Sequence, residues 1–120
     1  MTGSSLDPDT VSSLLESVGG DREFVAELFA TFAEEAPQLM ETIAAGMVSD
    51  DFGELRRAAH TLKSTSASLG ALRLSEVSRE LEEAGRTESR PDASRVAEAR
   101  ELLSDTLSEM SDFAQGSDTQ

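Results

Sequence analysis

The chain has 120 residues, enough for one domain with a single core, and its net charge is −14. This charge argues against binding to nucleic acid or to an anionic membrane, and the absence of Trp and Tyr removes the usual surfaces for base stacking. Cysteine is also absent, which excludes disulfides, thiolate nucleophiles and cysteine-based zinc sites.

The composition favours helices over strands. Ala, Leu, Glu and Arg are abundant, and no alternating run of β-branched and aromatic residues indicates a strand. The amino terminus lacks the basic region and apolar stretch of a signal peptide, and no apolar run is long enough to cross a membrane. We therefore expect a soluble, cytoplasmic, all-α protein. Two explanations of its acidity are open: it keeps the protein soluble, or it attracts a partner with a basic surface.

The first expected helix is short and lies near the amino terminus. Asp7 can cap its first turn, and Pro8 suits the first helical position. Four apolar residues then recur at helical spacing: Val11, Leu14, Leu15 and Val18. The pair of glycines at 19–20 ends the segment, which could cover one end of a helical bundle.

The second expected helix begins after Asp21, which can cap it. Its apolar stripe is formed by Phe24, Leu28, Phe32, Leu39, Ile43 and Met47, with Val25 and Phe29 beside them. Pro37 falls inside this segment, where it removes one backbone donor and crowds the carbonyl of Ala33. Because the apolar pattern resumes afterwards, we expect one kinked helix, with two separate helices as the alternative.

Three further helices are expected, and in each of them the inward residues recur at helical spacing. Asp51 and Glu54 resemble a capping box at the start of the third helix, and Gly70 can end it. Its inward residues are Leu55, Ala59, Leu62, Ser66 and Leu69. Those of the fourth helix are Leu72, Leu74, Val77, Leu81 and Ala84, after which Gly85 and the polar residues 87–92 are expected to turn the chain. Those of the fifth are Val96, Ala99, Leu103, Thr106, Met110 and Phe113.

Connections of two to eight residues between long amphipathic helices favour antiparallel neighbours. The sequence therefore predicts an up-down-up-down antiparallel four-helix bundle with a short extra helix at the amino terminus. We expect the folded domain to span residues 6–114, with residues 1–5 and 115–120 as flexible tails.

His60 is the only histidine, and it faces away from the expected core. Each helical residue advances about 100°, so His60 lies roughly 160° from the centre of the buried stripe at Leu62. Its neighbours three and four residues away on the same face are Arg56, Arg57, Lys63 and Ser64. Ala67 and Ser68 follow one turn further on. The imidazole is thus expected beside three cations and several small side chains.

This setting suits a phosphoryl group carried on the imidazole. Lys63 could contact the phosphate oxygens, and Arg56 or Arg57 could attract an acidic partner site or pair with local acids. The small residues Ser64, Ala67, Ser68 and Gly70 leave room for a second protein to approach within in-line transfer distance. A lone surface histidine often has no function, however, and one histidine without cysteine is a poor set of metal ligands.

Residues 59–71, AHTLKSTSASLGA, closely resemble the signature of histidine phosphotransfer (HPt) domains of two-component phosphorelays. The family pattern is roughly A-H-x-L-K-G-x-x-x-x-[LIV]-G-A, and Ser64 is a departure because the family commonly has glycine there. The likeness covers about residues 6–113 and includes the paired glycines before Asp21 and the Phe-rich helix that contains Pro37.

The resemblance implies that His60 accepts a phosphoryl group from a receiver-domain aspartyl phosphate, or from a kinase, and passes it to a response regulator. Lys63 would contact the phosphate, Ser64 could hydrogen-bond to it, and Gly70 would keep the docking surface open. The family is a relay intermediate rather than a turnover enzyme and holds no nucleotide or metal, because the receiver supplies the Mg²⁺. The expected partners are a response regulator and a histidine or hybrid kinase, and the expected state is a monomer.

Some family members place a glutamine near the imidazole, and the nearest counterpart by spacing is Glu82. A glutamate in contact with His60 would favour the imidazolium and oppose a second negative charge nearby. Two other functions remain open. The chain could bind a receiver or kinase without carrying phosphate. It could also be the dimerisation part of a sensor kinase, although Thr61 stands where such kinases usually have an acidic residue.

Overall fold

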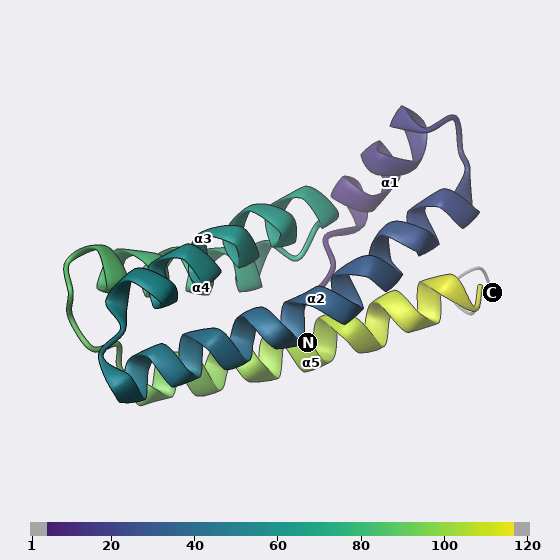
Figure 1. Cartoon of the computed structure of the whole chain (residues 1–120). Coiled ribbons are helices and arrows are strands. Elements are labelled where there is room, and N and C mark those ends of the chain that lie inside the picture. The colour runs from purple at the N-terminus through teal and green to yellow at the C-terminus, as the bar shows by residue number, and fades with distance from the viewer. Residues whose placement is uncertain (1–4, 117–120) are drawn as a thin grey trace.

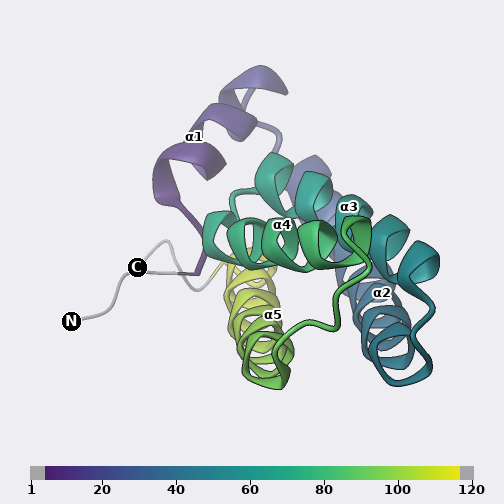
Figure 2. The same ribbon diagram turned by 90° about the vertical axis from the view of Figure 1, so that its left-hand side faces the viewer.

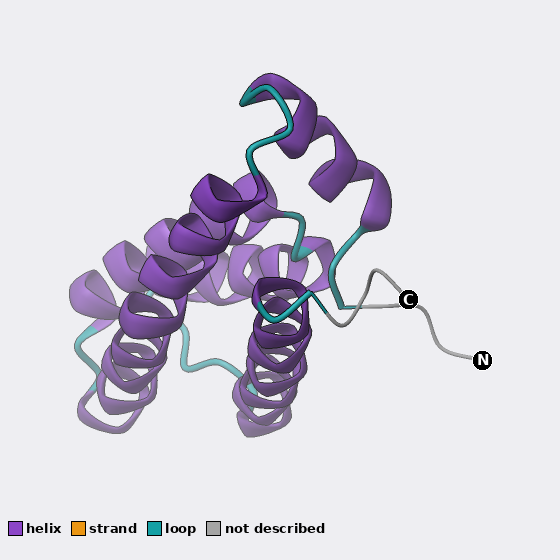
Figure 3. Ribbon diagram, turned by 90° about the vertical axis from the view of Figure 1, so that its right-hand side faces the viewer, coloured by secondary structure: helices purple, strands orange, loops and turns teal. Residues whose placement is uncertain are grey.

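Four of the five helices in the described part of the chain, residues 5–116, begin at an aspartate that caps them. The helices of this computed structural model are α1 (Pro8–Ser17), α2 (Arg22–Ser49), α3 (Phe52–Leu69), α4 (Leu72–Arg86) and α5 (Ala93–Ala114). The capping aspartates are Asp7, Asp21, Asp51 and Asp92, and each carboxylate accepts a hydrogen bond from a backbone N–H of the first turn. The residues described contain no strand (Figure 3).

Helices α2 to α5 form an antiparallel four-helix bundle, as the sequence predicts. Each packs against two others, in the order α2–α3–α4–α5 and back to α2 (Figures 1 and 2). The short α1 lies outside this ring against α3 and α2. None of these five helices combines the length and the apolar character that crossing a membrane would require.

The buried face of α2 is rotated relative to the expected stripe, of which only Phe32 and Ile43 are buried, whereas Leu28, Leu39 and Met47 are half-buried. The buried residues of α2 are Val25, Phe29, Phe32, Ala36, Met40, Ile43 and Gly46. Phe24, expected in the stripe, is 44% exposed, because Val25 rather than Phe24 starts the series that repeats at three and four residues. Pro37 lies within one continuous helix, so the alternative of two helices is wrong.

Gly85 does not turn the chain, contrary to the expectation from the sequence. It is buried inside α4, which continues to Arg86. A Cβ atom added at Gly85 would lie 2.9 Å from the Cβ of Arg56 and 3.0 Å from its Cα. The absence of a side chain therefore lets α4 approach the backbone of α3 closely at this point.

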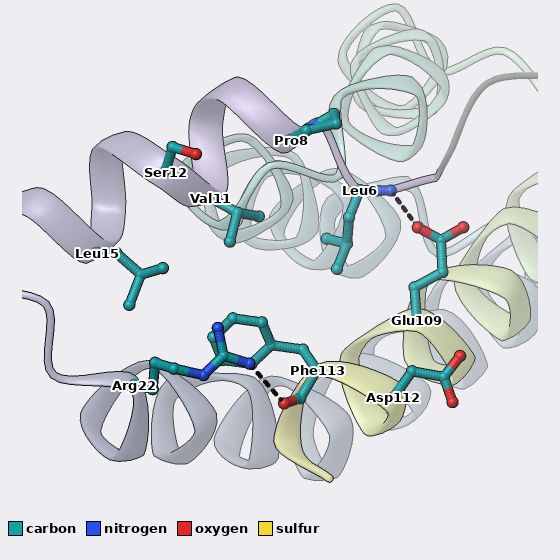
Figure 4. Close-up of a pocket in the computed structure, with 9 residues that line it drawn as sticks. All are labelled: Leu6, Pro8, Val11, Ser12, Leu15, Arg22, Glu109, Asp112 and Phe113. Carbon is teal, nitrogen blue, oxygen red and sulfur yellow. Dashed lines mark hydrogen bonds between the residues drawn. The ribbon is translucent and has the colours of Figure 1, made fainter. Parts of the chain in front are cut away.

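The first described residues of the chain are held against α5. Both oxygens of Glu109 accept backbone hydrogen bonds. One comes from Ser5 N at 2.8 Å, and the other comes from Leu6 N at 2.9 Å (Figure 4). Leu6 is buried, and its side chain borders a hollow of about 470 Å³ between α1, the start of α2 and the end of α5. Of the residues predicted to form tails, Ser5 is thus hydrogen-bonded to α5, and residues 1–4 and 117–120 lie outside the described residues.

The buried hydroxyl of Ser78 has no hydrogen-bond partner among residues 5–116. Ser78→Ala is expected to stabilise the protein by about 1 kcal/mol, because it removes an unsatisfied polar group and alanine is the better helix former. The matched control is Thr106→Val, since the buried Thr106 hydroxyl donates to the Leu102 carbonyl at 2.7 Å. That variant should lose about 1 kcal/mol. Urea unfolding of the two variants checks this, and a loss in both would contradict it.

Candidate functional site

His60 lies on the outer face of α3, as its helical phase predicts. Its side chain is 60% exposed, whereas Leu62 is fully buried. The imidazole is not free on this surface, because its Nδ1 atom lies 2.8 Å from Oε2 of Glu82 on α4. The contact between His60 and Glu82, which the spacing of the two residues in the sequence suggested, is therefore formed.

Glu82 joins His60 to the only lysine in the chain. Its second carboxylate oxygen, Oε1, lies 2.7 Å from Nζ of Lys63. The hydrogen bond from Lys63 lowers the pKa of Glu82, and the one from His60 lowers it further, against the opposing effect of burial. An ionised carboxylate only accepts hydrogen bonds, so Nδ1 of His60 carries the proton of this contact. When the ring is neutral, its Nε2 atom therefore keeps a lone pair.

The packing of α4 against α3 brings Glu82 to this position. The two helices are joined by a tight turn at Gly70 and Ala71, so they run back along each other from that point. The hydroxyl of Ser75 fastens the pair by donating to the Lys63 carbonyl at 2.9 Å. Nearly one turn beyond Glu82, Gly85 allows the close approach to Arg56 described above. These contacts hold the carboxylate within reach of both His60 and Lys63.

The imidazole borders a hollow on the amino-terminal side of its own position in α3. This hollow of about 400 Å³ is lined by Arg56, Arg57, His60, Thr61 and Glu82. Side chains on a helix lean towards its amino terminus, so His60 covers the turn that carries the two arginines. The Arg57 guanidinium is paired with Glu54 at 2.6 Å, whereas Arg56 forms no ion pair within residues 5–116.

Ser64 and Ser68 face a different hollow from the one that His60 borders. This second hollow, of about 310 Å³, lies between α2 and α3 and is lined by Leu28, Thr31, Phe32, Glu35, Ser64, Thr65, Ser68 and Leu69. Both serines and Ala67 are exposed, as expected for a low surface on α3. The structure thus brings His60 together with the arginines, and with Lys63 through Glu82, but it places the small residues on the next turns.

Gly70 is not part of the exposed surface, and the expectation that it keeps this surface open is wrong. It is buried, with a left-handed φ of 95°, and it ends α3. A Cβ atom at this position would lie 3.3 Å from the Cβ of Thr10 on α1. The backbone N–H of Asp7 also donates to the Gly70 carbonyl at 2.8 Å. This glycine therefore serves the helix end and the attachment of α1.

Within the part of the chain that the structure describes, no three His, Asp or Glu side chains are grouped so that they could hold a metal ion. A sequence model of the Hpt domain matches residues 27–113, which include the whole of α3 and α4. No curated protein matches the sequence significantly.

A solved structure shares the fold of the chain. It is the histidine-containing phosphotransfer protein B (HptB) from Pseudomonas aeruginosa PAO1. Its TM-score is 0.84 at 23% sequence identity, and the match covers 95% of this chain and 97% of that one.

Proposed function

Since this chain belongs to the Hpt domain family, we propose that His60 is the residue that carries the phosphoryl group in a two-component phosphorelay. The observation that carries this proposal is the arrangement of the sole histidine. Its Nδ1 atom is held by Glu82, its ring is largely exposed, and its Nε2 atom is left to react.

The chemistry follows from this arrangement of the ring. The Nε2 lone pair attacks the phosphorus of an aspartyl phosphate on a receiver domain, the bond from phosphorus to the aspartyl oxygen breaks, and the aspartate leaves as a carboxylate. The Nδ1 proton remains on the ring and keeps its hydrogen bond to the Glu82 carboxylate. The reverse reaction passes the group to a second receiver. In this proposal the receiver supplies the Mg²⁺ and the chain needs no cofactor of its own.

The surface around His60 also supports the choice of partner. Arg57 and the exposed small residues Ser64, Ala67 and Ser68 would face a receiver domain, whose phosphorylation site is acidic. Ser64 could hydrogen-bond to the phosphoryl group only from the side away from the arginine hollow. We further propose that the protein acts in the cytoplasm as a monomer, because a charge of −14 opposes association of two copies.

Transfer from a phosphorylated receiver tests the proposed function. Candidate receiver domains are labelled with radioactive phosphate, separated from their kinase and mixed with the protein. We expect the label to leave the receiver and to appear on this chain as acid-labile phosphate. Receivers that bind the chain tightly without passing label to it would instead indicate a module that binds without carrying phosphate.

Glu82→Gln is expected to shift the phosphoryl equilibrium towards His60. The variant removes a negative charge beside the phosphoryl group and releases Lys63 from its ion pair. For two charges about 6 Å apart in a water-like dielectric, the interaction is about 0.7 kcal/mol, which changes the equilibrium by about threefold. The measurement is the ratio of label on this chain to label on the receiver after equilibration. Glu83→Gln is the matched control, because Glu83 pairs with Arg86 away from His60. An equal shift in both variants would contradict the role given to Glu82.

A further inference from the structure

We propose that Arg56, rather than Lys63, is the first cation to contact the phosphoryl group on His60. This inference rests on the proposed role of His60 and assigns a positioning residue to it. The family signature draws attention to the lysine three residues after the histidine, whereas the geometry of this chain points to the arginine four residues before it.

The position of the imidazole favours Arg56. The hollow that His60 borders lies over the preceding turn of α3 and is lined by Arg56, and Lys63 is not among the residues that line it. Because Glu82 takes Nδ1, a phosphoryl group on the ring is bonded to Nε2. Lys63 instead contacts the other oxygen of the Glu82 carboxylate, Oε1, at 2.7 Å.

The charges around His60 support the same choice. Lys63 is engaged by Glu82 at 2.7 Å, and Arg57 is engaged by Glu54 at 2.6 Å. Arg56 has no carboxylate within ion-pair distance in the range 5–116. A phosphoryl group with close to two negative charges can therefore recruit Arg56 without breaking an existing ion pair. A guanidinium also offers two parallel donors to phosphate oxygens, which an ammonium does not.

The backbone of Arg56 is fixed next to α4. Its N, Cα and Cβ atoms lie at the point where the absent side chain of Gly85 lets the two helices meet. The side chain of Arg56 is exposed beyond that point and starts from a constrained position beside the hollow. The close approach at Gly85 thus brings α4 against α3 at the hollow that Arg56, His60 and Glu82 line together.

Chemical phosphorylation of the full chain tests this inference without a receiver domain. Phosphoramidate is the donor: Nε2 of His60 forms a bond to phosphorus, the nitrogen–phosphorus bond of the donor breaks, and ammonia leaves. The ring keeps its Nδ1 proton against Glu82. The ³¹P chemical shift of the phosphohistidine is then followed against pH. A guanidinium in contact favours the dianionic form, so removing it moves the titration midpoint to higher pH.

We expect Arg56→Gln to raise this midpoint and Arg56→Lys to restore most of the difference. Arg100→Gln, which removes the same charge from an arginine paired with Glu41 on α2, should leave the midpoint at the wild-type value. In the wild type, the Arg56 Nε–H signal should also shift on phosphorylation. A midpoint unchanged by Arg56→Gln but raised by Lys63→Gln would overturn the inference.

The two proposals fail in different ways. If no receiver passes phosphate to the chain, the relay function is wrong, yet the chemically phosphorylated protein still reports on Arg56. If receivers do label His60 but Arg56→Gln leaves the titration midpoint of the phosphohistidine unchanged, only the role of the arginine is wrong.

Discussion

His60→Gln is expected to accept no phosphate from any phosphorylated receiver domain, a complete loss rather than a graded one. The imidazole supplies the only nitrogen nucleophile of this kind in the chain, and glutamine has no lone pair of comparable reactivity on its amide nitrogen. The measurement is acid-labile label on the variant after incubation with a labelled receiver. Label on the variant equal to that on the wild type would show that another residue accepts the phosphate.

The variant is also expected to remain folded. His60 is largely exposed, and its contact with Glu82 lies on the protein surface rather than in the core. Circular dichroism and urea unfolding should therefore resemble those of the wild type, and receiver binding should persist. Retained binding with lost label separates a failure of chemistry from a failure of folding.

Gly85→Ala is expected to destabilise the bundle by about 1–3 kcal/mol and to loosen the site as well. The added methyl group would lie 2.9–3.0 Å from atoms of Arg56, two of them backbone atoms. Helix α4 must therefore move away from α3, and Glu82 moves with it. The expected results are a lower urea midpoint and a change in the imidazole signals of His60 in NMR spectra.

Gly53→Ala is the matched control for this prediction. Gly53 is exposed near the start of α3, and a Cβ atom there would come no closer than 3.7 Å to a neighbour. Alanine should stabilise this helix by up to about 1 kcal/mol through its higher propensity. If Gly85→Ala is as stable as Gly53→Ala, the close approach of α3 and α4 does not support the site.

Local chemistry explains which parts of the fold could be predicted from the sequence. Capping aspartates and helical periodicity act over a few residues, so the starts of α1, α2 and α3 follow directly from Asp7, Asp21 and Asp51. The face of α2 was placed wrongly at Phe24 because a large aromatic side chain outweighs Val25 in any hydrophobic pattern. Packing geometry decides between such neighbours, and it places Val25 inside.

The glycines show where local reasoning fails. Gly85 next to a polar segment indicates a turn, yet its position is set by contact with Arg56, almost thirty residues earlier. Gly70 was correctly expected at a helix end, but its burial comes from contact with α1. Both roles depend on segments distant in sequence, which spacing alone does not reveal.

The sequence predicts only part of the candidate site, because the contacts that α4 makes with α3 join segments distant in sequence. Helical phase correctly places His60 outside the core and beside Arg56 and Arg57. Helical phase gives no information on how α4 packs against α3. Spacing along the sequence therefore indicates Glu82 only weakly as the residue that bridges His60 and Lys63. Side chains on a helix lean towards its amino terminus, and this general rule places the imidazole on the side of the arginines rather than on the side of Ser64.

The most direct test of the central claim is the identity of the ring nitrogen that carries phosphorus. The protein is labelled with ¹⁵N in its single histidine, phosphorylated by its receiver and examined by NMR for coupling between ³¹P and the ring nitrogens. We expect phosphorus on Nε2 of His60, with the Nδ1 proton retained against Glu82. Phosphorus on Nδ1, or a phosphorylated chain with an unmodified imidazole, would contradict it.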